Sequence, residues 1–139
     1  MYEKILVAVD DSPERETVLK QAAELAKVIG AAVHILHIQT IDTGLLGSGV
    51  VEEDSGAVHD LVASSIKELS AQGITTDGEI REAVRPDIAR AVLSTATDRK
   101  AELIVIGARR HGGLTGLVLG SVADGVSHGT LPCPVLLVP

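Results

Sequence analysis

The chain has 139 residues, which suits one ordinary domain, and its net charge of −7 argues against polyanion binding by charge alone. Tyr2 is the only aromatic residue, so base-stacking platforms for nucleic acid are excluded and the core must be aliphatic. No apolar run approaches a membrane span, the first residues form a strand pattern instead of a signal peptide, and the single cysteine cannot form an internal disulfide. We therefore expect a cytoplasmic protein with no membrane and no nucleic-acid partner.

The first half of the chain alternates strand patterns with a helical one. Apolar runs over 4–9 and 33–38 predict two buried strands. Between them, we expect Ser12 to cap a helix that has Pro13 at its first position and ends at Gly30. Residues 40–56 carry four glycines and an acidic run, which is typical of a mobile loop.

The second half continues the alternation up to the last residues. The expected elements are a helix over 57–72, a strand over 75–83, a helix from 85, a strand over 103–107, a short helix over 121–128 and a last strand over 135–138. The strand over 75–83 is polar, and its Thr, Asp and Glu content does not suit burial on both faces. It is therefore expected at a sheet edge.

Strands that alternate with helices throughout imply an α/β fold with right-handed crossovers. We predict a single doubly wound (Rossmann-like) five-stranded parallel sheet with helices on both faces, forming one domain over residues 1–139. Such folds bind ligands beyond the carboxyl ends of their strands, where the strand order reverses. If the first and fourth strands flank that reversal, Asp10 faces the loop that starts at Gly107.

The segment 107–121 is rich in glycine, which lets several backbone N–H groups approach an anion closely. Two interpretations stand: a phosphate-binding loop, or glycines that only form turns. Ser121 has the spacing of a helix N-cap, and a cap at the start of a phosphate-binding helix serves both roles. Asp10 is either a turn residue or an acceptor for a ligand N–H or hydroxyl. Arg109 and Arg110 place positive charge in the loop.

Common catalytic signatures are absent from the sequence. It has no G-x-x-x-x-G-K-[ST] loop, no G-x-S-x-G elbow and no G-x-G-x-x-G after the first strand. Cys133 lies between two prolines and is expected to be an inert packing thiol. His34 and His37 are three positions apart in one strand, which puts them on opposite faces and keeps them from sharing a metal. We assign no catalytic residue and no metal ligand.

Four segments together resemble the universal stress protein family, and the resemblance covers the whole chain. They are the opening strand with the residues Asp-Asp-Ser after it, the strand over 103–107, the block over 113–122 and the ending over 133–138. The resemblance implies the sheet order 3-2-1-4-5 and a homodimer formed through the last strand, Val135–Val138. An unpaired apolar edge there would also be prone to association.

One branch of that family binds ATP through the motif G-x2-G-x9-G-[ST]. Here the motif starts at Gly107 and ends at Gly120-Ser121, but its second glycine is replaced by Arg110. Arg110 either pairs with phosphate oxygens or blocks the site. By resemblance, the nucleotide-binding residues are Ala8, Val9, Asp10, Ile38, Ile106 and Gly107 at the adenine and ribose end, and Arg109, Arg110, Gly113, Gly120, Ser121, Val122 and Ala123 at the phosphate end.

The resemblance implies a non-enzymatic stress-response protein: a homodimer that binds ATP, with Mg²⁺ held through phosphates and water, and whose ligation alters its contacts with unknown protein partners. Two alternatives stand beside it. Arg110 favours a nucleotide-free interaction module of the same fold, and related folds that carry out adenylation leave a slow ATPase open. Because ring stacking is excluded, an adenine would lie between aliphatic walls.

Overall fold

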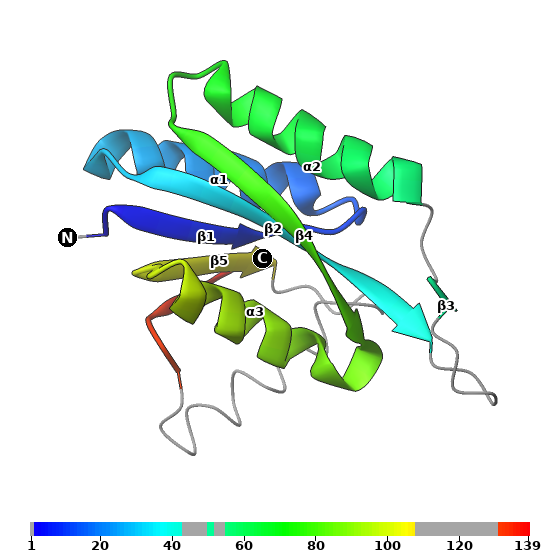
Figure 1. Cartoon of the computed structure of the whole chain (residues 1–139). Helices are drawn as coiled ribbons and strands as arrows, with labels where there is room; N and C mark the ends of the chain where they lie inside the picture. The colour runs from blue at the N-terminus through cyan, green and yellow to red at the C-terminus, as the bar shows by residue number, and fades with distance from the viewer. Residues whose placement is uncertain (1, 43–49, 52–54, 108–130) are drawn as a thin grey trace.

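The structure is a computed structural model that describes residues 2–42, 50–51, 55–107 and 131–139 (Figure 1). Strands and helices alternate along the chain. The elements are β1 (Lys4–Ala8), α1 (Arg15–Ile29), β2 (Ala32–Asp42), β3 (Val50–Val51), α2 (Ser55–Ser70), β4 (Thr76–Val84), a 3₁₀ turn (Arg85–Asp87), α3 (Ile88–Asp98), β5 (Leu103–Gly107) and β6 (Val135–Val138).

Five strands form a parallel sheet in the order β4-β2-β1-β5-β6, which confirms the predicted order 3-2-1-4-5. β1 lies in the middle, with β2 on one side and β5 on the other, so the strand order reverses at β1. The register places Val7 opposite both Ile35 and Val105. The carboxyl ends of β1 and β5 therefore lie side by side, as the sequence predicts.

Helices cover both faces of the sheet because successive strand residues point to opposite sides. Residues such as Val7 and Ile35 pack in a fully aliphatic core with α1 and α2. Leu6 and Leu36 point the other way and pack with α3, for example against Val92. Figure 1 shows α3 on the side of the sheet opposite α1 and α2. The two aliphatic cores explain the continuous apolar runs of the inner strands.

β4 is an edge strand, which confirms the prediction from its polar sequence. It pairs with β2 from Thr76 to Val84, and most of its side chains are half-buried or exposed. Gly78 is needed where the strand passes under α2, because a Cβ there would lie 2.9 Å from the Ile35 carbonyl oxygen and 3.0 Å from Ile66 Cδ1.

Two predictions about element boundaries were wrong. α1 begins at Arg15, after the N-cap residue Glu14, and Ser12 is not its cap. Ser12 lies instead in a turn before the helix: its N–H donates to the Asp10 carboxylate at 3.0 Å, and its carbonyl accepts the Arg15 N–H at 3.1 Å. The loop predicted over 40–56 was also too long, since β2 continues to Asp42 and pairs antiparallel with Val50–Val51.

Other boundaries shifted by a few residues or are not described. Gly30 ends α1 with a left-handed φ of 71°, as predicted. The third helix opens with the 3₁₀ turn that contains Pro86, and the α-helix proper starts at Ile88. The helix predicted over 121–128 lies outside the described residues.

Candidate functional site

The carboxyl end of β1 is anchored to β2 by two short hydrogen bonds. The Val9 N–H donates to the Leu36 carbonyl at 2.9 Å, and His37 Nδ1 donates to the Val9 carbonyl at 2.7 Å. A carbonyl only accepts, so this bond assigns the ring proton to Nδ1. Only 3% of His37 is exposed, and its position in a buried strand gave no sign of this role. These two bonds hold the backbone of Val9, and so fix where the loop after β1 begins.

Asp10 follows directly and is half-buried at the edge of the sheet. Its Oδ1 accepts the Ser12 N–H, which is the turn role that the sequence left open. That bond occupies one carboxylate oxygen and orients the group, and a carboxylate has room for further acceptor bonds at its second oxygen. The turn role and a ligand-accepting role are therefore compatible in one side chain.

Ile38 continues β2 past the end of β1. Because the Leu36 carbonyl accepts from Val9, the backbone groups of Leu36 point toward β1, and so do those of Ile38 two residues later. β1 ends at Ala8, opposite Leu36. The N–H and C=O of Ile38 therefore face the space beyond the end of β1. A planar ligand that carries one hydrogen-bond donor and one acceptor on the same edge would pair with both groups.

The β5 side of the reversal is close-packed. Ala8, Ile38 and Ile106 belong to the core that faces α3, and each is at least 94% buried. Gly107 ends β5, and a Cβ there would meet Val18 Cγ2 at 3.4 Å. These residues form an aliphatic floor beneath the carboxyl edge.

Half of the predicted site lies outside the described residues. The structure brings together Ala8, Val9, Asp10, Ile38, Ile106 and Gly107 at one edge of the sheet. The predicted phosphate end, made of Arg109, Arg110, Gly113, Gly120, Ser121, Val122 and Ala123, falls in the segment that is not described.

One buried polar atom near this edge has no partner among the described residues. Gln39, next to Ile38 on β2, is 5% exposed, and its Nε2 makes no hydrogen bond to the part of the chain that the structure describes. A buried amide nitrogen without a partner is rare and costs stability. A lone glutamine in a strand carries no motif, so the sequence gives no sign of this buried atom.

Another polar cluster joins β2, β4 and the end of α3, on the face that α3 covers. His34 Nδ1 lies 2.7 Å from Asp77 Oδ1, and His34 Nε2 lies 2.7 Å from Glu79 Oε2. Glu79 also pairs with Arg81 at 2.6 Å and with Arg99 at 2.8 Å. Both ring nitrogens of His34 are thus occupied, which leaves the imidazole no free nitrogen for general acid or base chemistry.

The cluster changes the titration of Glu79. Burial raises its pKa, but hydrogen bonds from Arg81, His34 and Arg99 outweigh that effect and lower the pKa from 4.5 to about 2. The hydrogen bonds of Arg81 to Glu79 and Asp98 outweigh its burial and raise the pKa of Arg81. Glu79 therefore stays ionised at any pH near neutrality, and its role is to hold β4 and the end of α3 together.

Three further features of the described residues bear on the predicted chemistry. Burial raises the pKa of the half-buried Cys133 thiol, as expected for a packing residue. Among the described residues, no group of three or more His, Cys, Asp or Glu side chains is placed to hold a metal ion. No helix in the described part of the chain is long and apolar enough to cross a membrane.

Comparison with known proteins decides the family. The model of the universal stress protein family matches residues 1–139. The chain belongs to the universal stress protein family. It is 30% identical to the universal stress protein YxiE of Bacillus subtilis, over 99% of both chains. It is 33% identical to a universal stress protein of Thermus aquaticus, again over 99% of both.

A solved structure matches the fold of this universal stress protein. The structure of a universal stress protein from Archaeoglobus fulgidus in complex with dAMP aligns with a TM-score of 0.69 and 26% identity, and covers 99% of this chain and 98% of the other. The resemblance first recognised in four segments is therefore confirmed over the whole length.

Proposed function

We propose that this universal stress protein binds an adenine nucleotide, with ATP as the expected ligand, at the carboxyl edge between β1 and β5, and acts without catalysing a reaction. The observation that carries the proposal is the arrangement of Asp10 and the Ile38 backbone above an aliphatic floor. The free backbone edge of Ile38 suits an adenine edge, and Asp10 suits ribose hydroxyls. The dAMP complex of the Archaeoglobus fulgidus relative supports the same ligand class.

Calorimetry with dAMP, AMP and ATP, each with and without Mg²⁺, tests the proposal on the purified chain. Asp10→Asn should weaken binding about tenfold, because a hydrogen bond to a charged group contributes roughly 1.5 kcal/mol or more. The matched control is Asp11→Asn, since Asp11 is adjacent and exposed. The proposal fails if no nucleotide gives heat at millimolar concentration, or if the two variants lose affinity equally.

Arg110 supports a second candidate, a nucleotide-free interaction module. Its side chain stands where the ATP-binding motif has its second glycine. In that case Arg110→Gly creates nucleotide binding that the parent chain lacks. If the parent already binds as tightly as Arg110→Gly, the second candidate is wrong. Phosphate release measured on the same samples tests the non-enzymatic assignment: a rate proportional to protein would contradict it.

We propose further that the protein forms a homodimer through β6. β6 pairs with β5 on one side, and its Leu136 and Leu137 are 39% and 40% exposed. An apolar edge strand of this kind favours pairing with a second copy. Light scattering should give twice the chain mass of 14.4 kDa, and Leu137→Lys should shift it to one chain mass. A monomer mass for the parent at micromolar concentration would refute dimerisation.

A further inference from the structure

α3 is too short to cover its face of the sheet. Its 11 residues span roughly 16 Å, whereas the 11 residues of β2 span roughly 36 Å. α3 ends at Asp98, and the chain then turns through Arg99 and Ala101 into β5. Beyond the end of α3, no helix of the described residues lies above the amino ends of β1, β2 and β4.

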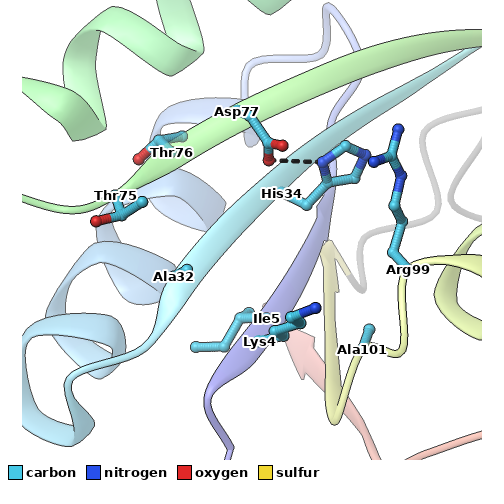
Figure 2. Close-up of a pocket in the computed structure, with 9 residues that line it drawn as sticks. All are labelled: Lys4, Ile5, Ala32, His34, Thr75, Thr76, Asp77, Arg99 and Ala101. Atoms are coloured by element: carbon cyan, nitrogen blue, oxygen red, sulfur yellow. Dashed lines mark hydrogen bonds and ion pairs between the residues drawn. The ribbon is translucent and has the colours of Figure 1, made fainter.

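A cavity of about 240 Å³ occupies this uncovered region (Figure 2). That volume is below the roughly 300–1,000 Å³ of pockets for drug-sized ligands, so it suits a smaller molecule. Its lining combines apolar groups with polar ones at the rim: Lys4, Ile5, Ala32, His34, Thr75, Thr76, Asp77, Arg99 and Ala101. It lies at the opposite end of the strands from the carboxyl edge.

The acidic groups around the cavity have partners, whereas one of its basic groups has none among the described residues. Glu79 behind it is neutralised by Arg81 and Arg99, and Asp77 Oδ1 is bonded to His34. Lys4 is exposed and makes no ion pair with the described residues. The ammonium group of Lys4 is therefore available to pair with a ligand anion.

Arg99 supplies a second cationic group to the same cavity. Its Nε and Nη2 both lie 2.8 Å from one oxygen of Glu79, Oε2. A guanidinium has two edges for planar recognition, and the edge that carries Nη1 is not used by this contact. The Glu79 contact also orients the guanidinium, so that less freedom is lost when a second carboxylate binds.

We infer that this cavity binds a small organic carboxylate, with its head group between Lys4 and Arg99 and its short apolar tail on Ala32 and Ala101. A phosphate is disfavoured because Asp77 is 71% exposed and a doubly charged group would meet its carboxylate. His34 does not react with the ligand, because both ring nitrogens are occupied. The inference is independent of the nucleotide site.

The test is a ¹H–¹⁵N NMR titration of the full chain with butyrate, n-butanol and n-butylamine, which share one tail. Butyrate should shift the amides of the cavity residues saturably, with a millimolar Kd, and the alcohol and amine should not saturate. Inorganic phosphate in a fourth titration should bind more weakly than butyrate. If butanol saturates equally, the cavity binds only the apolar tail and does not recognise a carboxylate, which would overturn the inference.

Variants of Lys4 test whether the carboxylate head group binds beside this side chain. Lys4→Gln should weaken butyrate about threefold or more, in line with the modest contribution of exposed ion pairs, and Lys4→Arg should restore most of the affinity. The control is Lys20→Gln, which removes the same charge from an exposed position on α1. Butyrate shifts that are absent, or that are the same in Lys4→Gln and Lys20→Gln, overturn the inference. Repeating the titration with dAMP present should leave the Kd unchanged.

Discussion

Replacing Glu79 by Gln tests whether the polar cluster on β4 stabilises the fold. The pKa of Glu79 is lowered from 4.5 to about 2, so the charged form is preferentially stabilised in the folded state. At about 1.4 kcal/mol per pKa unit, the full effect is roughly 3 kcal/mol, and screening at the 47% exposed Arg99 reduces it to about 2 kcal/mol. Since the folded pKa is the lower one, this stability is complete above pH 4.5 and is lost as the pH falls toward 2.

Urea unfolding between pH 7 and pH 3 measures this contribution. Glu79→Gln should lose about 2 kcal/mol at pH 7, and the difference from the parent should shrink by more than half at pH 3. The control is Glu82→Gln, on the same strand but exposed, which should change stability by less than about 0.5 kcal/mol. The reasoning is refuted if both variants behave alike, or if the loss caused by Glu79→Gln is independent of pH.

Three further predictions concern individual residues. Gln39→Met should raise the free energy of unfolding by about 1 kcal/mol in urea titrations, because it removes a buried amide nitrogen that has no partner among the described residues. Gly78→Ala should lower the melting temperature, since its Cβ would crowd a backbone oxygen at 2.9 Å, whereas Gly107→Ala, with an ordinary contact at 3.4 Å, should cost less. Cys133 should react with iodoacetamide more slowly than free cysteine near pH 8, because burial raises the pKa of its thiol.

The fold was predictable because it depends on patterns that are local or nearly so. Continuous apolar runs identified the inner strands, polar content identified β4 as an edge, and the family resemblance supplied the strand order. The predicted start of α1 was wrong by a few residues. Ser12 belongs to a turn in which its N–H donates to the Asp10 carboxylate, and α1 begins at Arg15. Serine is typical of both turns and helix caps, so the sequence signal for the two is similar.

The candidate site was predictable only in its position. A reversal of strand order beside β1 places a site at the carboxyl edge, and that argument needs no side-chain detail. The bond from His37 to the Val9 carbonyl was missed because its partners are 28 residues apart and carry no motif. The orphan nitrogen of Gln39 was missed for the same reason.

The cavity at the other end of the sheet could not be predicted, because it depends on contacts between residues that are far apart in sequence. Arg99 and Ala101, which follow the end of α3, line it. Its polar side depends on the hydrogen bonds of His34 to Asp77 and Glu79, which are 43 and 45 residues away. In a parallel sheet, the residues paired across two strands are separated in sequence by at least one crossover connection. The register between β2 and β4 therefore decides which charged side chains lie beside the cavity. A one-residue slip of β4 would point Asp77 and Glu79 to the α2 face and remove both hydrogen-bond partners of the His34 ring.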